Sequence, residues 1–222
     1  MGKRRKFPIT VTKINTAEKR ELALEVIQHV YTEEKGWTPT CEDILPEDEL
    51  LKASVSWFLA FEKDEPVGVL RVLYELPIEL YKAYGFELTE KGMDVDAFLN
   101  NNKVAEIGRY AVTPKNRSNF MISMSLMREA VRDTLERGYT HYITDVFEKD
   151  PNSPLEFHQK ILGFKKVATH ETGELHIESR RITMLLDLKK CYLALAQKNN
   201  WIFRFMTQDN SVPLIDIAKT AQ

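Results

Sequence analysis

Three charged side chains stand in segments that otherwise consist of apolar or small residues. Glu106 and Arg109 lie three residues apart in segment 105–112 (Ala-Glu-Ile-Gly-Arg-Tyr-Ala-Val), and Arg71 lies in the apolar segment 67–74. An unpaired charge in a buried strand is costly, so each of these side chains must meet a protein partner or a substrate. A carboxylate so placed can accept a proton from an amine, and a guanidinium can hold the carboxylate of a small molecule. The three residues are therefore candidates for proton transfer and substrate binding.

The same residues also permit a purely structural interpretation. Glu106 is equally well explained as half of an ion pair with Arg71 or Arg109, and the arginines can instead neutralise Glu106, Asp43 or Asp48. Side chains three residues apart in a strand point to opposite faces, so Glu106 and Arg109 cannot meet unless a bulge intervenes. Without a bulge, Arg71 on a neighbouring strand is the partner that we expect for Glu106.

A basic, polar loop follows segment 105–112 and leads into helical periodicity over residues 119–137. The first amides of a helix have no partner within the helix and together carry about half a positive charge. With the guanidinium of Arg117 they could bind a phosphate. The candidate phosphate-binding side chains are Lys115, Arg117, Ser118 and Asn119. The alternative is an ordinary strand-to-helix connection capped by Asn or Ser, and the loop alone does not decide between the two.

The elements that position these residues follow from the hydrophobic pattern. Residues 15–18 are typical of a helix-capping box, and they precede an apolar face that includes Leu22, Val26 and Val30. The other predicted elements are strands at 7–14, 55–61, 67–74, 105–112, 141–147 and 181–188, a long helix at 119–137 ended by Gly138, and a short helix at 154–162 ended by Gly163. This order predicts an α/β (α+β) fold with a mixed central sheet covered by helices on both faces. We expect 105–112 and 141–147 to be parallel neighbours joined by the long helix.

Composition narrows the class of function. The chain has 222 residues and a formal net charge of −2, so its bulk charge favours neither nucleic acid nor a membrane surface as a partner. No apolar run approaches the roughly 20 residues that span a bilayer, and the isolated Cys41 and Cys191 fit reduced thiols in the cytoplasm. His158 and His176 have no partner at metal-ligand spacing, so we expect no metal. The basic start, residues 3–6, is either a solvated tail or a contact for an acidic partner.

Residues 104–164 resemble the acyl-thioester core of the GCN5-related N-acyltransferases. The resemblance rests on a strand, Val112-Thr113-Pro114, a basic loop with Arg117, a long helix, a second strand, Asn152 and Gly163-Phe164. It implies a mixed, mostly antiparallel sheet. One domain is expected over residues 1–188, with residues 189–222 as a helical extension packed on it. The family usually has small residues where this chain has Phe120 and Ile122, and many members have a tyrosine acid where this chain has Gln159.

Both departures are typical of one branch, the autoinducer (acyl-homoserine-lactone) synthases and long-chain N-acyl amino acid synthases, which take acyl groups from acyl carrier protein. The residues that match this branch are Tyr31, Trp37, Asp48, Arg71, Glu106 and Arg109. Two positions differ, with Ile27 in place of an arginine and Leu51 in place of an acidic residue. The acceptor can therefore be an amino acid or another amine, and either fits as well as the amine substrate of the homoserine-lactone branch.

The resemblance implies an N-acyltransferase that moves an acyl group from acyl carrier protein phosphopantetheine, or from acyl-CoA, to a small-molecule amine acceptor. The implied catalytic residues are Glu106, Arg71 and Val112, the last through its amide as an oxyanion donor. The implied donor-binding residues are Val112, Lys115, Arg117, Ser118, Asn119 and Asn152, and the implied acceptor-binding residues are Tyr31, Trp37, Arg71 and Arg109. The alternatives are an acetyl-CoA-dependent acetyltransferase and a non-catalytic ligand-binding module of the same fold. The large side chains at 120 and 122 count against the first, and Glu106 with two arginines counts against the second.

Overall fold

A computed structural model of the chain describes residues 8–76, 87–88, 94–150, 153–171, 179–198 and 200–207. The chain forms two compact units, one of Met1–Val72 with Arg109–Val131 and the other of Leu73–Gly108 with Arg132–Gln222. The predicted boundary at residue 188 is a different division and stays a prediction. Within the described ranges, no helix is long and apolar enough to cross a membrane.

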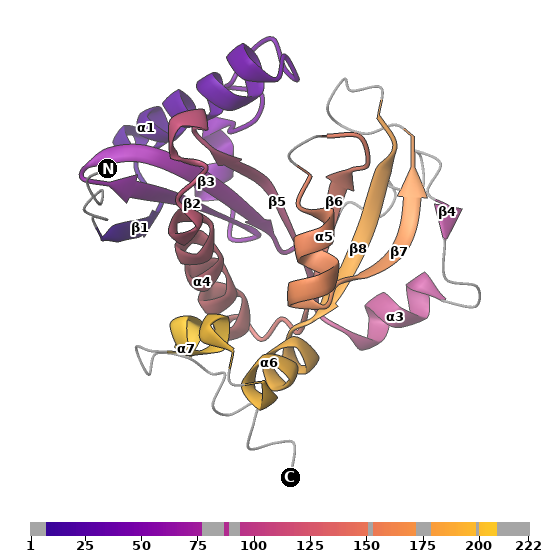
Figure 1. The fold of residues 1–222 in the computed structure, drawn as a ribbon. Coiled ribbons are helices and arrows are strands. Elements are labelled where there is room, and N and C mark those ends of the chain that lie inside the picture. Colours follow the sequence, from indigo (N-terminus) through magenta and orange to yellow (C-terminus); the bar gives the residue numbers. More distant parts are fainter. Residues whose placement is uncertain are drawn as a thin grey trace. The chain divides into compact units, whose positions relative to one another are not determined.

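The first unit contains a strand order of β1-β2-β3-β5 (Figure 1). Its strands are β1 (Ile9–Lys13), β2 (Val55–Glu62), β3 (Glu65–Leu73) and the end of β5 (Val104–Val112). Strands β1 and β2 pair antiparallel, from Ile9 opposite Glu62 to Lys13 opposite Phe58. The predicted hairpin at 55–74 is present, but only Lys63 and Asp64 separate its strands. Both residues have positive φ (53° and 65°), the backbone of a tight two-residue turn, which explains why the strands extend further than expected.

The N-terminal helix of this unit begins one residue later than the capping box at residues 15–18 predicts. α1 (Ala17–Ile27) is capped by Thr16, whose hydroxyl accepts a hydrogen bond from the Lys19 amide at 3.3 Å. The third helical residue is therefore Lys19, so no glutamate completes a capping box. The helix continues as a wider π-helical segment, η1 (Gln28–Glu34), which leads to Gly36 with a φ of 62°. Val26 and Val30 are buried as predicted.

A glycine in β3, Gly68, has no side chain and lets the long helix α4 (Phe120–Glu136) pack closely on that strand. A Cβ atom on Gly68 would lie 3.1 Å from Cγ2 of Ile122 and 3.2 Å from Cδ1 of Leu126. Both side chains are fully buried. This contact fixes the beginning of α4, and with it the loop that connects α4 to β5. Gly138, with a φ of 77°, follows the end of α4 as predicted.

The second unit contains the strand order β5-β6-β8-β7-β4. Its elements are the beginning of β5, β4 (Glu87–Leu88), α3 (Val95–Asn101), β6 (His141–Phe147), α5 (Leu155–Phe157), η4 (His158–Leu162), β7 (Lys165–His170), β8 (Arg181–Asp187), α6 (Leu188–Gln197) and α7 (Trp201–Thr207). Strands β5 and β6 are parallel, from Val104 opposite His141 to Glu106 opposite Ile143, as predicted. The pairings β6–β8, β7–β8 and β4–β7 are antiparallel. The sheet is thus mixed and mostly antiparallel, which confirms the predicted fold class.

The main element that sequence analysis missed is β7. It follows Gly163, which ends η4 with a φ of 82° as expected for a helix C-terminus. The described part of residues 189–222 is helical, forming most of α6 and all of α7.

Candidate active site

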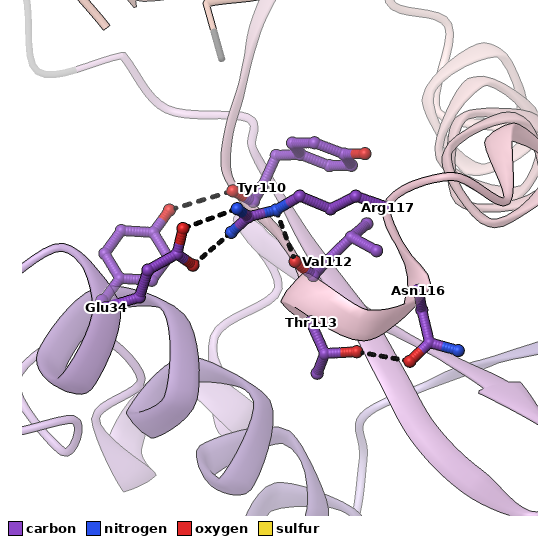
Figure 2. A network of polar contacts seen from close by, with 7 residues as sticks. Glu34, Tyr110, Val112, Thr113, Asn116 and Arg117 are labelled. Carbon is purple, nitrogen blue, oxygen red and sulfur yellow. Dashed lines mark hydrogen bonds and ion pairs between the residues drawn. The ribbon is translucent and has the colours of Figure 1, made fainter. Parts of the chain in front are cut away.

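The guanidinium of Arg117 is the centre of a polar network at the end of β5 (Figure 2). Its Nε donates to the carbonyl oxygen of Val112 at 3.2 Å. Its Nη1 donates to Oε1 of Glu34 at 2.6 Å, and its Nη2 donates to the other carboxylate oxygen of the same residue. Arg117 thus holds the last residue of β5 with one nitrogen and a carboxylate from η1 with the other two. The two side chains are 30% and 28% exposed, so solvent reaches the pair.

The other long polar side chains of the loop also contact glutamates. The amide groups of Asn116 and Asn119 donate to the two carboxylate oxygens of Glu62, at 2.8 and 3.0 Å. Lys115 donates to Glu65 at 2.9 Å, with both side chains largely exposed. The loop that was predicted to bind a phosphate therefore has carboxylates against its positive charges. Sequence analysis identified the basic residues and missed these acidic partners.

Several backbone amides at the beginning of α4 already donate hydrogen bonds to acceptors within the chain. The amides of Asn119 and Ile122 donate to the carbonyls of Asn116 and Asn119, at 2.9 and 3.1 Å, and the amide of Met121 donates to Oδ1 of Asn119 at 3.3 Å. The two large residues of this turn point in different directions, because Ile122 is fully buried whereas Phe120 is 39% exposed. Of the two departures from the family's small residues, only Phe120 is exposed at the beginning of α4.

The end of β5 is held firmly in place. Val112 and Thr113 are buried, and the Thr113 amide donates to the carbonyl of Val67 at 3.0 Å. The Thr113 hydroxyl donates to Oδ1 of Asn116 at 2.8 Å (Figure 2), which begins the turn η3 (Pro114–Asn116). The peptide group between Val112 and Thr113 therefore has a fixed direction, and it adjoins the Val112 amide that was predicted to act as the oxyanion donor.

Residue Arg109 interrupts the regular geometry of β5. Its φ is 46°, in the left-handed region that residues other than glycine rarely adopt. Regular strand alternation therefore does not extend through Arg109, and a contact between Glu106 and Arg109 stays a prediction. The half-buried Glu106 lies against the neighbouring glycine, since a Cβ atom on Gly108 would lie 3.1 Å from Oε1 of Glu106. Glu106 belongs to the second unit and Arg71 to the first, and their pairing stays a prediction.

The predicted acceptor-binding aromatic residues contact one another. The rings of Tyr31 and Trp37 meet edge to face, with centroids 5.3 Å apart. The Tyr31 hydroxyl donates to the carbonyl of Tyr110 at 3.3 Å. Burial raises the pKa of Tyr31 to about 12, while the positive charges of Arg109 and Arg71 act in the opposite direction. The structure thus brings Tyr31, Trp37, Arg71 and Arg109 into one region of the first unit.

Glu49 lies beside Arg71, whereas Asp48, which we matched by spacing, is largely exposed. Oε2 of Glu49 accepts from the indole nitrogen of Trp57 at 2.7 Å, and its Oε1 lies 3.8 Å from Nη1 of Arg71. The side chain of Asp48 is 66% exposed and contacts Lys52 at 2.6 Å. Both acidic residues lie in the 3₁₀ turn η2 (Glu47–Leu51), where successive side chains point about 120° apart. Spacing alone could not distinguish them.

Three predicted features lie outside the described residues: Asn152, the basic residues 3–6, and His176. His158 is described, and burial lowers its pKa to about 4. Its ring contacts that of Phe164, with centroids 4.8 Å apart. Among the residues that the structure describes, no group of three or more His, Cys, Asp or Glu side chains could hold a metal ion.

No protein-family model and no curated protein sequence matches the chain. Solved structures do match it. FeeM, an N-acyl amino acid synthase from uncultured soil microbes, superposes with a TM-score of 0.65 at 18% identity, covering 86% of this chain and 97% of FeeM. An aminoglycoside 6′-N-acetyltransferase complexed with coenzyme A gives a TM-score of 0.56 at 15% identity, covering 81% of this chain and 97% of that one. The ribosomal-protein-S18-alanine N-acetyltransferase from Escherichia coli gives 0.55 at 12% identity, covering 82% and 94%. At these identities the likeness establishes the fold, which is that of the GCN5-related N-acyltransferases.

Proposed function

We propose that this chain is an N-acyltransferase that moves an acyl group from a pantetheine thioester to the amine of an amino acid or a similar small acceptor. The observation that carries the proposal is the fixed end of β5, where Arg117, from the loop that leads into α4, donates to the Val112 carbonyl at 3.2 Å. Support comes from the fold shared with FeeM, itself an N-acyl amino acid synthase. The donor is acyl carrier protein phosphopantetheine or acyl-CoA.

The reaction needs three contributions from the chain. The amine nitrogen of the acceptor attacks the thioester carbonyl carbon, and the amide of Val112 would stabilise the resulting oxyanion. The carbon–sulfur bond then breaks as the nitrogen loses a second proton and the amide is formed, and the thiolate takes up that proton to leave as the thiol. Before the attack the acceptor ammonium must lose a proton, and we assign this step to Glu106, directly or through a water molecule. Arg71 and Arg109, with Tyr31 and Trp37, would hold the rest of the acceptor.

The donor half of this proposal is tested by removing Arg117. Arg117→Ala should weaken binding of a pantetheine thioester by about 1–3 kcal/mol, the range for a charged hydrogen bond. Lys52→Ala is the matched control, since it removes an exposed cation that contacts Asp48. Dissociation constants for acyl-CoA and acyl carrier protein thioesters, measured by isothermal titration calorimetry, decide the matter. An unchanged constant for every thioester would contradict a donor site at this loop.

The proton transfer is tested by Glu106→Gln, which keeps the volume and removes the base. Single-turnover acyl transfer at saturating donor should fall by about 10²–10⁴, while the melting temperature stays near that of the native protein. A variant that melts normally and transfers at the native rate would make Glu106 structural. In that case the mechanism, though not the donor site, would be wrong.

A second candidate function is acetyl transfer from acetyl-CoA. It is favoured by the burial of Ile122. Because this large side chain points into the interior, it does not obstruct the loop before α4. The two functions differ in the donor that the protein uses. Turnover with acetyl-CoA at a rate equal to or above that with long-chain acyl thioesters would select acetyl transfer.

A further inference from the structure

Glu34 and Arg117 are 83 residues apart in the sequence and meet through two parallel hydrogen bonds (Figure 2). We propose that Glu34 is a displaceable counterion of the donor site: its carboxylate holds the Arg117 guanidinium in the free protein, and the donor phosphate takes its place. This proposal rests on the proposed function, which puts the donor phosphate at this loop. It assigns to Glu34 a role in setting the affinity for the donor.

The geometry allows the exchange without rearranging the loop. Glu34 occupies Nη1 and Nη2, the same pair of donors that a phosphate takes in a bidentate contact. The third donor, Nε, is held separately by the Val112 carbonyl. Arg117 can therefore replace one anion by another at its outer edge while it stays attached to the end of β5.

The exposure of the pair also fits an exchangeable contact. Both side chains are a little under one-third exposed, so a ligand can approach from solvent. A pair of this kind is only weakly stabilising, since water competes with it and salt screens it. A fully buried pair would be much harder to separate, because separation would leave an uncompensated charge in the interior.

A purely structural role predicts the opposite effect on donor binding. If Glu34 only positioned Arg117, its removal would loosen the guanidinium and weaken the donor site. If Glu34 competes with the phosphate, its removal strengthens binding, because the donor no longer has to displace a carboxylate. The sign of the change therefore separates the two roles.

The test measures binding of 4′-phosphopantetheine by isothermal titration calorimetry to the native protein, Glu34→Gln and Glu33→Gln. Glu34→Gln should bind about fivefold more tightly, the equivalent of about 1 kcal/mol for a partly exposed pair. Glu33→Gln is the matched control: Glu33 is the preceding residue of η1, is 52% exposed and contacts His29. It should bind like the native protein. Glu34→Asp, which is too short to keep both contacts, provides a second variant if the first fails to fold.

Two further measurements fix the origin of the effect. Pantetheine without its phosphate should bind the native protein and Glu34→Gln equally, and Glu34→Gln should have no effect when Arg117 is already replaced by glutamine. Weaker or unchanged binding of 4′-phosphopantetheine to Glu34→Gln would overturn the proposal, as would equal tightening for pantetheine. If neither the native protein nor the variant binds 4′-phosphopantetheine or coenzyme A, the proposed donor site is itself wrong. That outcome differs from native binding without tightening, which refutes only the role of Glu34.

Discussion

Replacing Glu49 by glutamine would remove the negative charge beside Arg71 while leaving an amide oxygen for the indole of Trp57. The native carboxylate lies 2.7 Å from the Trp57 nitrogen and 3.8 Å from Nη1 of Arg71. The side chains of Arg71 and Glu49 are only 8% and 15% exposed, so little water is available to replace the lost partner. The substitution should therefore destabilise the first unit.

The size of the effect follows from these distances and exposures. Removing one partner of a buried ion pair typically costs about 3–5 kcal/mol. The 3.8 Å separation is at the long end for a contact, so we place the loss at about 2–3 kcal/mol, with the weaker hydrogen bond from Trp57 included. For a chain of this length, a loss of 1 kcal/mol lowers the melting temperature by about 2–4 °C. Glu49→Gln should thus melt roughly 4–12 °C below the native protein.

Thermal melting followed by circular dichroism measures this loss, and the neighbouring residue supplies the control. Asp48→Asn removes an equal charge from the same turn, but its side chain is 66% exposed and its cationic partner is the half-exposed Lys52. Its melting temperature should stay within about 2 °C of the native value. Equal effects of the two substitutions, or a larger effect at Asp48, would refute the assignment of Glu49 as the inner carboxylate.

Three other predictions concern packing, pH and the acidic carrier. Gly68→Ala should destabilise the protein by about 1–3 kcal/mol in denaturant unfolding, because its methyl group would lie 3.1 Å from Cγ2 of Ile122, and an unchanged midpoint would contradict the close packing of α4 on β3. Burial lowers the pKa of His158 to about 4 from about 6.5 in an unfolded chain, so the unfolded state binds the proton first and about 2–3 kcal/mol of stability is lost as the pH falls from 6.5 to 4. Melting curves of His158→Phe should lack most of this loss, whereas His29→Gln, at an exposed histidine, should retain it. Binding of acyl carrier protein, which is strongly acidic, should weaken with added salt and on deletion of residues 3–6, and binding that is insensitive to salt would refute that role for the basic start.

Much of the fold could be predicted because its elements have clear boundaries and periods. Segment 105–112 ends before Pro114, and the long helix ends before Gly138, so the parallel β5–α4–β6 unit was visible in the sequence. Strand β7 was missed for two physical reasons. It begins with two lysines, and its next four residues, from Val167 to His170, are all buried, so the alternation of polar and apolar residues is missing. A shift in its register between Lys166 and Ala168 disturbs the pattern further.

The candidate site could be predicted only as far as its local residues. Arg117 and Asn119 were recognised because they follow a strand and precede a helix. Their partners Glu34 and Glu62 lie 83 and 57 residues away, so no spacing along the chain connects them. The contact of Glu49 with Arg71 could not be predicted for a different reason, since neighbouring residues in a 3₁₀ turn face different directions and spacing does not show which of them points inward.

Because Arg117 already has a carboxylate partner, the proposed affinity for a donor at this loop would depend on an exchange of anions at Arg117. A phosphate that binds Arg117 gains a bidentate contact and ends the one with Glu34, so only the difference between the two contacts contributes to binding. That difference is the net contribution of about 1–3 kcal/mol that Arg117→Ala should remove. The phosphate would also fix the position of the pantetheine arm, as phosphate contacts with an arginine fork are directional. Discrimination among donors must come from the parts of the donor beyond the phosphate, namely the acyl chain or the surface of a carrier protein.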